Sequence, residues 1–177
     1  MNLQEYENFY HVDISTQIEN KWKTDTVLGI VKDSKRHSIK IKAKDKLKIR
    51  KRFITREISK SEKRHNKKIV AIVYSYLLYK SLCEFNEANP LLLCRDVRPE
   101  RFVIHYFQRV SNFFENKDIL NKKIKFRKRT EFETENKLPK SLAGKYVRKV
   151  YQKKIKPNKI LNSSEVEELL DIIGKII

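Results

Sequence analysis

The sequence predicts an α/β protein in which helices flank a mixed five-stranded sheet. Three predicted strands come first, followed by a helix, a strand, a helix, a further strand and then helices. Three consecutive strands most simply form an antiparallel meander, and the alternating units add parallel strands through right-handed crossovers. A chain of 177 residues with 40% hydrophobic residues can form one substantial core. We expect one α/β domain over residues 1–156 and an extra amphipathic helix over residues 157–177.

The first three predicted strands are short. Residues 9–15 and 24–32 carry apolar residues at strand spacing. The third strand is expected to begin near His37, where isoleucines alternate with lysines, and the alternation resumes as far as Ile49. The alternating residues include Lys40, Lys42 and Lys44. Such a pattern is normally a solvated strand face, and here that face is also a row of positive charges.

The first long helix has an N-terminal signal. Ser59 and Glu62 have the spacing of a capping box, and the apolar run after them predicts a helix that is packed on two sides and ends within 85–89. Residues 91–94 form a short apolar segment, typical of a strand in the middle of a sheet. Pro99 suits the first turn of a second helix.

The second helix is predicted to bury an aromatic stripe, which is typical of a core and not of a base-stacking platform. The stripe consists of Phe102, Val103, Tyr106, Phe107, Val110, Phe113 and Phe114. Residues 122–133 predict a further strand and residues 139–154 a third helix. Ser164 and Glu167 have the spacing of a second capping box, which predicts the start of a terminal amphipathic helix.

The charge composition is the strongest functional signal. Forty-one Lys and Arg against 22 Asp and Glu give a formal net charge of +19 at pH 7. This charge attracts polyanions, and we expect binding to nucleic acid (RNA, DNA or a hybrid) through the phosphate backbone. Trp22, Tyr146 and Tyr151 are aromatic residues interleaved with the basic clusters. The predicted backbone-binding residues are Lys40, Lys42, Lys44, Arg98, Lys145, Arg148 and Lys149.

Several other functional classes are disfavoured. Three glycines in the whole chain argue against a P-loop, a dinucleotide fingerprint and a nucleophile elbow. Cys83 and Cys94 show no zinc-binding spacing and are expected to be buried core residues. There is no apolar stretch near membrane length and no basic amphipathic anchor, so we expect no membrane partner. The N-terminal residues lack the layout of a signal peptide, which predicts a cytoplasmic protein.

One aspartate lies on a predicted central strand, and a second follows another. The order of elements is that of the ribonuclease H fold, in which the first and fourth strands are neighbours. Asp13 and Asp96 would then meet at one end of the sheet, with His11 on the same side as Asp13. Two adjacent carboxylates repel unless a proton or a divalent ion intervenes. We therefore expect Mg²⁺ or Mn²⁺ at Asp13 and Asp96, where the ion could activate water and orient a scissile phosphate.

Three short motifs carry a family resemblance that covers roughly residues 9–154. They are the segment 11–17 around Asp13, the segment 96–99 that begins with Asp96, and the segment 140–148. Together they resemble the uncharacterised YkuK-type family of ribonuclease H-like proteins. The resemblance implies a ribonuclease H-like fold with an acidic metal site.

The chain departs from that family pattern at two acidic positions. Gly144 stands where the family has a carboxylate at the start of the late helix, and the centre of the first long helix, residues 69–74, lacks an acidic residue. Glu57 and Glu62, or a glutamate among Glu131, Glu133 and Glu135, are candidate replacements.

Three functions stay open at this point. The first is a nucleic-acid-binding protein with weak Mg²⁺- or Mn²⁺-dependent nuclease activity, a hydrolase with Asp13 and Asp96 as catalytic and metal-binding residues. The alternative is an inactive RNA- or DNA-binding module, for example one that docks on structured or ribosomal RNA. The third is a structural subunit whose basic faces contact an acidic protein. The terminal helix is a candidate surface for a protein partner or for self-association, because its first turn is acidic.

Overall fold

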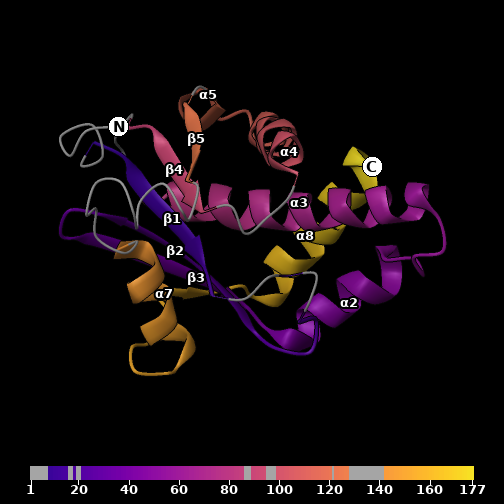
Figure 1. Cartoon of the computed structure of the whole chain (residues 1–177), viewed down its shortest axis with the longest axis horizontal. Coiled ribbons are helices and arrows are strands. Elements are labelled where there is room, and N and C mark those ends of the chain that lie inside the picture. The colour runs from indigo at the N-terminus through magenta and orange to yellow at the C-terminus, as the bar shows by residue number, and fades with distance from the viewer. Residues whose placement is uncertain are drawn as a thin grey trace.

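The computed structural model describes residues 8–15, 18, 21–85, 89–94, 99–120, 122–127 and 142–177. These residues form an α/β fold with a mixed six-stranded sheet and helices on both of its faces (Figure 1). The strands are β1 (Tyr10–Ile14), β2 (Thr26–Lys32), β3 (Lys35–Ile41), β4 (Leu91–Cys94), β5 (Ile124–Arg127) and β6 (Lys159–Ile160). The helices are α2 (Ala43–Phe53), α3 (Lys60–Leu82), α4 (Glu100–Phe113), α5 (Lys117–Leu120), α7 (Leu142–Tyr151) and α8 (Ser163–Ile176).

The sheet has the order β5-β4-β1-β2-β3-β6. Strands β1, β2 and β3 form the predicted antiparallel meander, and β4 and β5 add to it in parallel. Val12 of β1 lies opposite Leu93 of β4, which confirms that the first and fourth strands are neighbours. The prediction of five strands was wrong because β6 also pairs with β3. A strand of two residues is too short to show the alternation of apolar and polar residues by which a strand is predicted.

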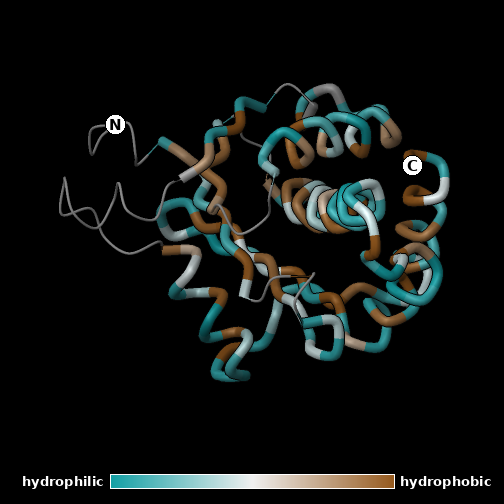
Figure 2. The backbone as a smooth tube through the Cα atoms, turned by 45° about the vertical axis from the view of Figure 1, so that its right-hand side comes forward, coloured by the Kyte–Doolittle hydropathy of each residue, from teal (hydrophilic) through white to brown (hydrophobic). Residues whose placement is uncertain are grey.

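The larger core lies between one face of the sheet and the helices α3, α4 and α8. Helix α3 begins at the predicted capping box, in which Ser59 and Glu62 each accept a hydrogen bond from the other's backbone N–H. It ends at Leu82, earlier than predicted. In Figure 2 hydrophobic stretches lie along the strands, and helices other than α3 alternate between hydrophobic and hydrophilic residues around their turns. Helix α3 is buried nearly all round because the sheet lies on one side and α4 and α8 on another.

Two predictions about the helices around this core need correction. Helix α4 buries the predicted stripe as far as Val110, whereas Phe113 is 40% exposed near the end of the helix and Phe114, just after it, is half-buried against the core. Helix α8 is capped by Asn162 and Glu165, not by Ser164 and Glu167. Both pairs have the same spacing, so the sequence alone does not choose between them. The apolar side of α8 packs inside the chain against α3 and α4.

Residues 43–53 form a helix where the sequence predicted a continuation of the third strand. The Asp25 Oδ1 atom accepts the backbone N–H of Ala43 at 2.9 Å, so a residue far along the chain satisfies one of the free N–H groups at the start of α2. The alternating pattern was misleading because Ile49 is buried while Leu47 is 39% exposed. Lys42 and Lys44 are therefore not on a strand with Lys40.

Helix α7 covers the opposite face of the sheet with a second, smaller apolar cluster. The cluster consists of Val27 and Val31 of β2 with Ala143, Tyr146, Val147 and Val150 of α7. The cysteines do not belong to either core: Cys83 is exposed and Cys94 is half-buried, so the prediction that both are buried was wrong. None of the helices within the described ranges has the length and apolar character needed to cross a membrane.

Candidate functional site

Asp13 lies near the C-terminal end of the central strand β1, on the face of the sheet that α7 covers. The strand register places Asp13 opposite Gly29 and His11 opposite Val31, so Asp13 and His11 share this face, as predicted. Asp13 is 8% exposed, and its Oδ1 atom accepts the N–H of Ile14 at 2.8 Å. A buried carboxylate is unfavourable unless neighbouring groups compensate it, so its position at a strand end marks a candidate site.

Gly29 allows α7 to lie directly on the sheet beside Asp13. A Cβ atom at Gly29 would overlap the Cγ2 atom of Val147 and lie 3.3 Å from the Cδ1 atom of Tyr146. The absence of a side chain at this position therefore sets how closely α7 approaches β2. Nothing in the local sequence predicted this role, because it depends on a helix more than a hundred residues further along the chain.

A polar network fixes α7 against β3. The Tyr146 hydroxyl group lies 3.0 Å from Ser38 Oγ and donates to the Asn158 side-chain oxygen at 2.7 Å. That same oxygen accepts the backbone N–H of Ser38 at 2.9 Å. Tyr146 is 7% exposed and Trp22 is 9% exposed, so these two aromatic residues from the basic clusters are buried. Tyr151 is 37% exposed.

The second predicted carboxylate, Asp96, lies outside the described residues, as does Arg98. What the structure describes is the strand that leads to them. The aligned pair Val12 and Leu93 is followed by Asp13 on β1 and by Cys94, the last residue of β4. Glu131, Glu133 and Glu135 also lie outside the described part of the chain.

The described residues contain no group of three or more His, Cys, Asp or Glu side chains that could hold a metal ion. Glu62, one candidate replacement ligand, already accepts the N–H groups of Ile58 and Ser59 at 3.0 and 2.7 Å. These hydrogen bonds lower the pKa of Glu62. Glu57 accepts a weak hydrogen bond from Asn66 at 3.4 Å. Both glutamates are therefore engaged in hydrogen bonds around the start of α3. The described residues do not by themselves form a metal site.

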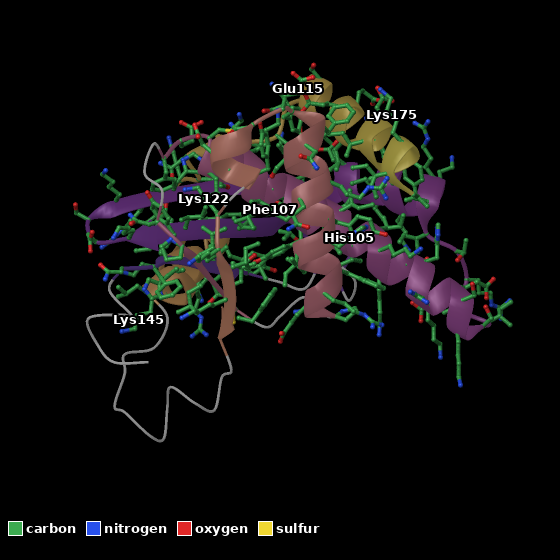
Figure 3. All side chains as sticks on the ribbon, turned by 90° about the horizontal axis from the view of Figure 1, so that it is seen from above. His105, Phe107, Glu115, Lys122, Lys145 and Lys175 are labelled. Carbon is green, nitrogen blue, oxygen red and sulfur yellow. The ribbon has the colours of Figure 1, made fainter. Side chains whose placement is uncertain are left out.

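Every charged residue on the exposed side of α7 is a cation. Lys145, Arg148 and Lys149 are exposed, while the sheet side of the helix is apolar. The segment 145–156 contains six Lys and Arg and no Asp or Glu. Figure 3 shows Lys145 on α7, away from the α4 helix that carries His105 and Phe107. The ion pairs found between described residues do not involve these three cations.

The three cations that were predicted to lie on the third strand do not form one row. Lys40 of β3 is paired with Asp25, with 3.1 Å between Nζ and Oδ2, and its side chain is 22% exposed. Lys42 is the exposed N-cap residue of α2, and Lys44 is exposed on α2 itself. The predicted stripe is therefore divided between a paired strand lysine and the start of a helix.

A fully buried lysine, Lys46, was not singled out from the sequence. Its ammonium group donates to the Lys21 carbonyl at 2.9 Å and to Thr26 Oγ1 at 2.7 Å. Burial lowers the pKa of Lys46 to about 8, and the nearby Asp25 carboxylate opposes this shift. Burial acts to raise the pKa of Asp25, but the hydrogen bond from Ala43 and the contact with Lys40 outweigh it and lower the pKa. Lys46 therefore fixes α2 in place and is not a surface cation.

Comparison with known proteins gives no relative from which a role can be transferred. No protein-family model matches the chain, and no curated protein or solved structure is significantly similar to it.

Proposed function

We propose that this protein binds nucleic acid through its phosphate backbone, on a ribonuclease H-like scaffold. The observation that carries the proposal is the exposed face of α7, where Lys145, Arg148 and Lys149 have no acidic neighbour within the helix. They form no ion pair with another described residue, and a cation that is not already paired can exchange its counterion for a phosphate without breaking an ion pair first. The formal net charge of +19 favours the same partner over long range.

The scaffold part of the proposal is supported by the strand order. An antiparallel meander whose first strand also pairs in parallel with the fourth, followed by a parallel fifth strand, is the arrangement expected of a ribonuclease H-like sheet. Helix α7 then lies over the central strand that carries Asp13. This arrangement also agrees with the YkuK-type resemblance, although β6 is an addition to it.

Fluorescence anisotropy with labelled single strands and duplexes of DNA, RNA and hybrid tests the binding. The full-length protein should bind at least one of them, and the logarithm of its association constant should fall linearly with the logarithm of the salt concentration. The proposal fails if none of these polymers binds at about 0.1 M salt, where the screening length is still about 10 Å.

Phosphodiester hydrolysis is a second candidate function, favoured by one observation. Asp13 lies at the end of β1 beside β4, the strand that leads to Asp96. A divalent ion such as Mg²⁺ or Mn²⁺ held there would activate water for attack on a phosphate. The carboxylates available to hold it are Asp13 and Asp96, so this function depends on both.

A cleavage assay with Mn²⁺ separates hydrolysis from binding alone. Asp13→Asn keeps the oxygen that accepts the Ile14 N–H, so the substitution should preserve the fold while removing the charge. Hydrolysis predicts that Asp13→Asn and Asp96→Asn each abolish a chelator-sensitive cleavage without weakening anisotropy binding. Cleavage that persists at the wild-type rate in both variants excludes this site as its source.

A further inference from the structure

The loop between α2 and α3 exposes an isoleucine far more than any other large apolar side chain that the structure describes. Ile58 is 78% exposed, whereas the remaining exposed large apolar residues range from 37% to 47%. A single exposed apolar side chain is ordinary on a protein surface. Ile58 differs from the others in the extent of its exposure and in its place among charged residues, which makes it the candidate for a contact with a partner.

This loop is held in one conformation by side chains of α3. The buried Asn66 donates to the Thr55 carbonyl at 2.9 Å and accepts the Thr55 N–H at 3.1 Å. Glu62 accepts the N–H of Ile58 itself, and His65 Nε2 lies 3.0 Å from the Phe53 carbonyl. Ile58 is thus presented by a fixed backbone, which reduces the entropy lost when it makes a contact.

The surroundings of the loop are strongly basic. Residues 43–68 contain twelve Lys and Arg and three acidic residues. Two of the acidic side chains are engaged locally, since Asp45 is buried and Glu62 caps α3. The exposed cations nearest in sequence to Ile58 are Arg52, Arg56, Lys60, Lys63 and Arg64. Figure 1 shows α2 and the start of α3 at the opposite end of the molecule from α7.

We propose that the loop 54–59 is a second nucleic-acid contact, in which the surrounding cations hold the phosphate backbone of a duplex and Ile58 inserts between neighbouring bases. This inference rests on the proposed function and extends it to duplexes that are unstacked locally. Proteins that bend or open a duplex combine basic residues with an apolar wedge, and isoleucine is one of the residues they use. The charge complementarity of residues 43–68 favours a polyanion over other partners.

The test uses the full-length protein and short DNA and RNA duplexes that carry 2-aminopurine beside a single mismatch, the step that unstacks most easily. Binding of the wild type should raise the 2-aminopurine fluorescence, because an inserted side chain unstacks that base. Ile58→Ser should abolish the rise and weaken binding roughly tenfold, since less apolar surface is buried on binding. Ile58→Leu should retain both properties, and so should Ile104→Ser, a matched control on the exposed side of α4.

A second arm tests the cations around the loop. The double variant Arg56→Gln and Lys60→Gln should reduce the slope of the salt dependence by about 2 if both residues contact phosphates of a DNA duplex. Ile58→Ser should leave that slope unchanged, because it removes no charge. The two parts of the contact are therefore measured separately.

Each outcome has a defined meaning. If the wild type binds the duplexes but 2-aminopurine fluorescence does not rise, or if Ile58→Ser binds and responds like the wild type, the wedge is overturned while the proposed function stands. Binding to poly-glutamate that requires Ile58, without any effect of Ile58 on duplex binding, would assign the loop to an acidic protein instead. Failure of the wild type to bind any nucleic acid would overturn the proposed function itself.

Discussion

The two faces of the sheet are built from the same strands but differ in what they bury. Toward α3, α4 and α8, the strands contribute a large core of isoleucine, leucine, valine and tyrosine side chains. Toward α7, the apolar cluster has only six members, and His11, Asp13 and Ser38 are buried on the same side. The α3 side also buries polar side chains, among them His37 and Ser75, but within a much larger apolar core. The α7 side buries a carboxylate beside a small apolar cluster, so it contributes less to folding and is the better candidate for function.

The largest expected effect of a substitution lies in the α3-side core. Phe107 is fully buried, and Phe107→Ala should lower the free energy of unfolding by about 3–5 kcal/mol, because it removes apolar contacts and leaves a cavity. Phe113→Ala, on the same helix but 40% exposed, is the control and should cost far less. Urea denaturation measures both. Equal losses in the two variants would contradict the assignment of this face as the main core.

The α7 face should respond most strongly to Gly29→Ala. The added Cβ atom overlaps Val147, so the variant should lose about 1–3 kcal/mol of unfolding free energy. Adding Val147→Ala to it should restore part of the loss. Gly174→Ala is the matched control, since its Cβ atom would meet nothing within 4 Å and alanine favours a helix. A Gly29→Ala variant as stable as the wild type would show that α7 does not pack this closely.

Lys46 is a buried cation on the α3 side, and it makes stability depend on pH. The pKa of Lys46 is lowered from 10.5 to about 8 by burial, so between these values the unfolded chain binds the proton more tightly than the folded protein does. The free energy of unfolding contributed by this group therefore rises as the pH increases from about 8 to 10.5. Urea denaturation at several pH values should show the free energy of unfolding of the wild type rising relative to that of Lys46→Met over this range, because the other groups that titrate there are the same in both proteins. If the wild type and Lys46→Met have identical pH profiles, burial does not lower the pKa of Lys46.

A smaller effect is expected from the polar network that joins α7 to β3. Tyr146→Phe removes the hydroxyl group that contacts Ser38 and Asn158, at a cost of about 1 kcal/mol of unfolding free energy. Tyr151→Phe, at an exposed position, should leave stability unchanged. If both substitutions are neutral in thermal denaturation, the network does not stabilise α7.

Local sequence signals predicted much of this fold. Leu91–Cys94 has the bounds expected from its apolar run, and the capping box at Ser59 marks the start of α3. The neighbouring positions of β1 and β4 followed from the order of elements alone. These features share a cause, since each depends on a pattern that is contained in a few consecutive residues or in the chain order.

Features that depend on contacts between distant residues were missed. Helix α2 begins where Asp25 accepts the N–H of Ala43, and it is anchored by Lys46, neither of which is visible in the alternation of residues 39–49. Gly29 matters because α7 packs directly on it, and the loop that carries Ile58 is held in place by hydrogen bonds of Asn66. Of the predicted site, Asp13 lies near the end of β1 and the three predicted cations of α7 are exposed, whereas Lys40 is paired with Asp25.

The most direct test of the central claim compares two triple variants of α7 in salt titrations of duplex DNA binding. One replaces Lys145, Arg148 and Lys149 with glutamine, and the other, Lys145→Arg, Arg148→Lys and Lys149→Arg, keeps the charge. If these residues contact three phosphates, the glutamine variant should bind more weakly and its salt-dependence slope should fall by about 2.7, while the charge-preserving variant stays near the wild type. A glutamine variant with the wild-type affinity and slope would contradict binding through α7.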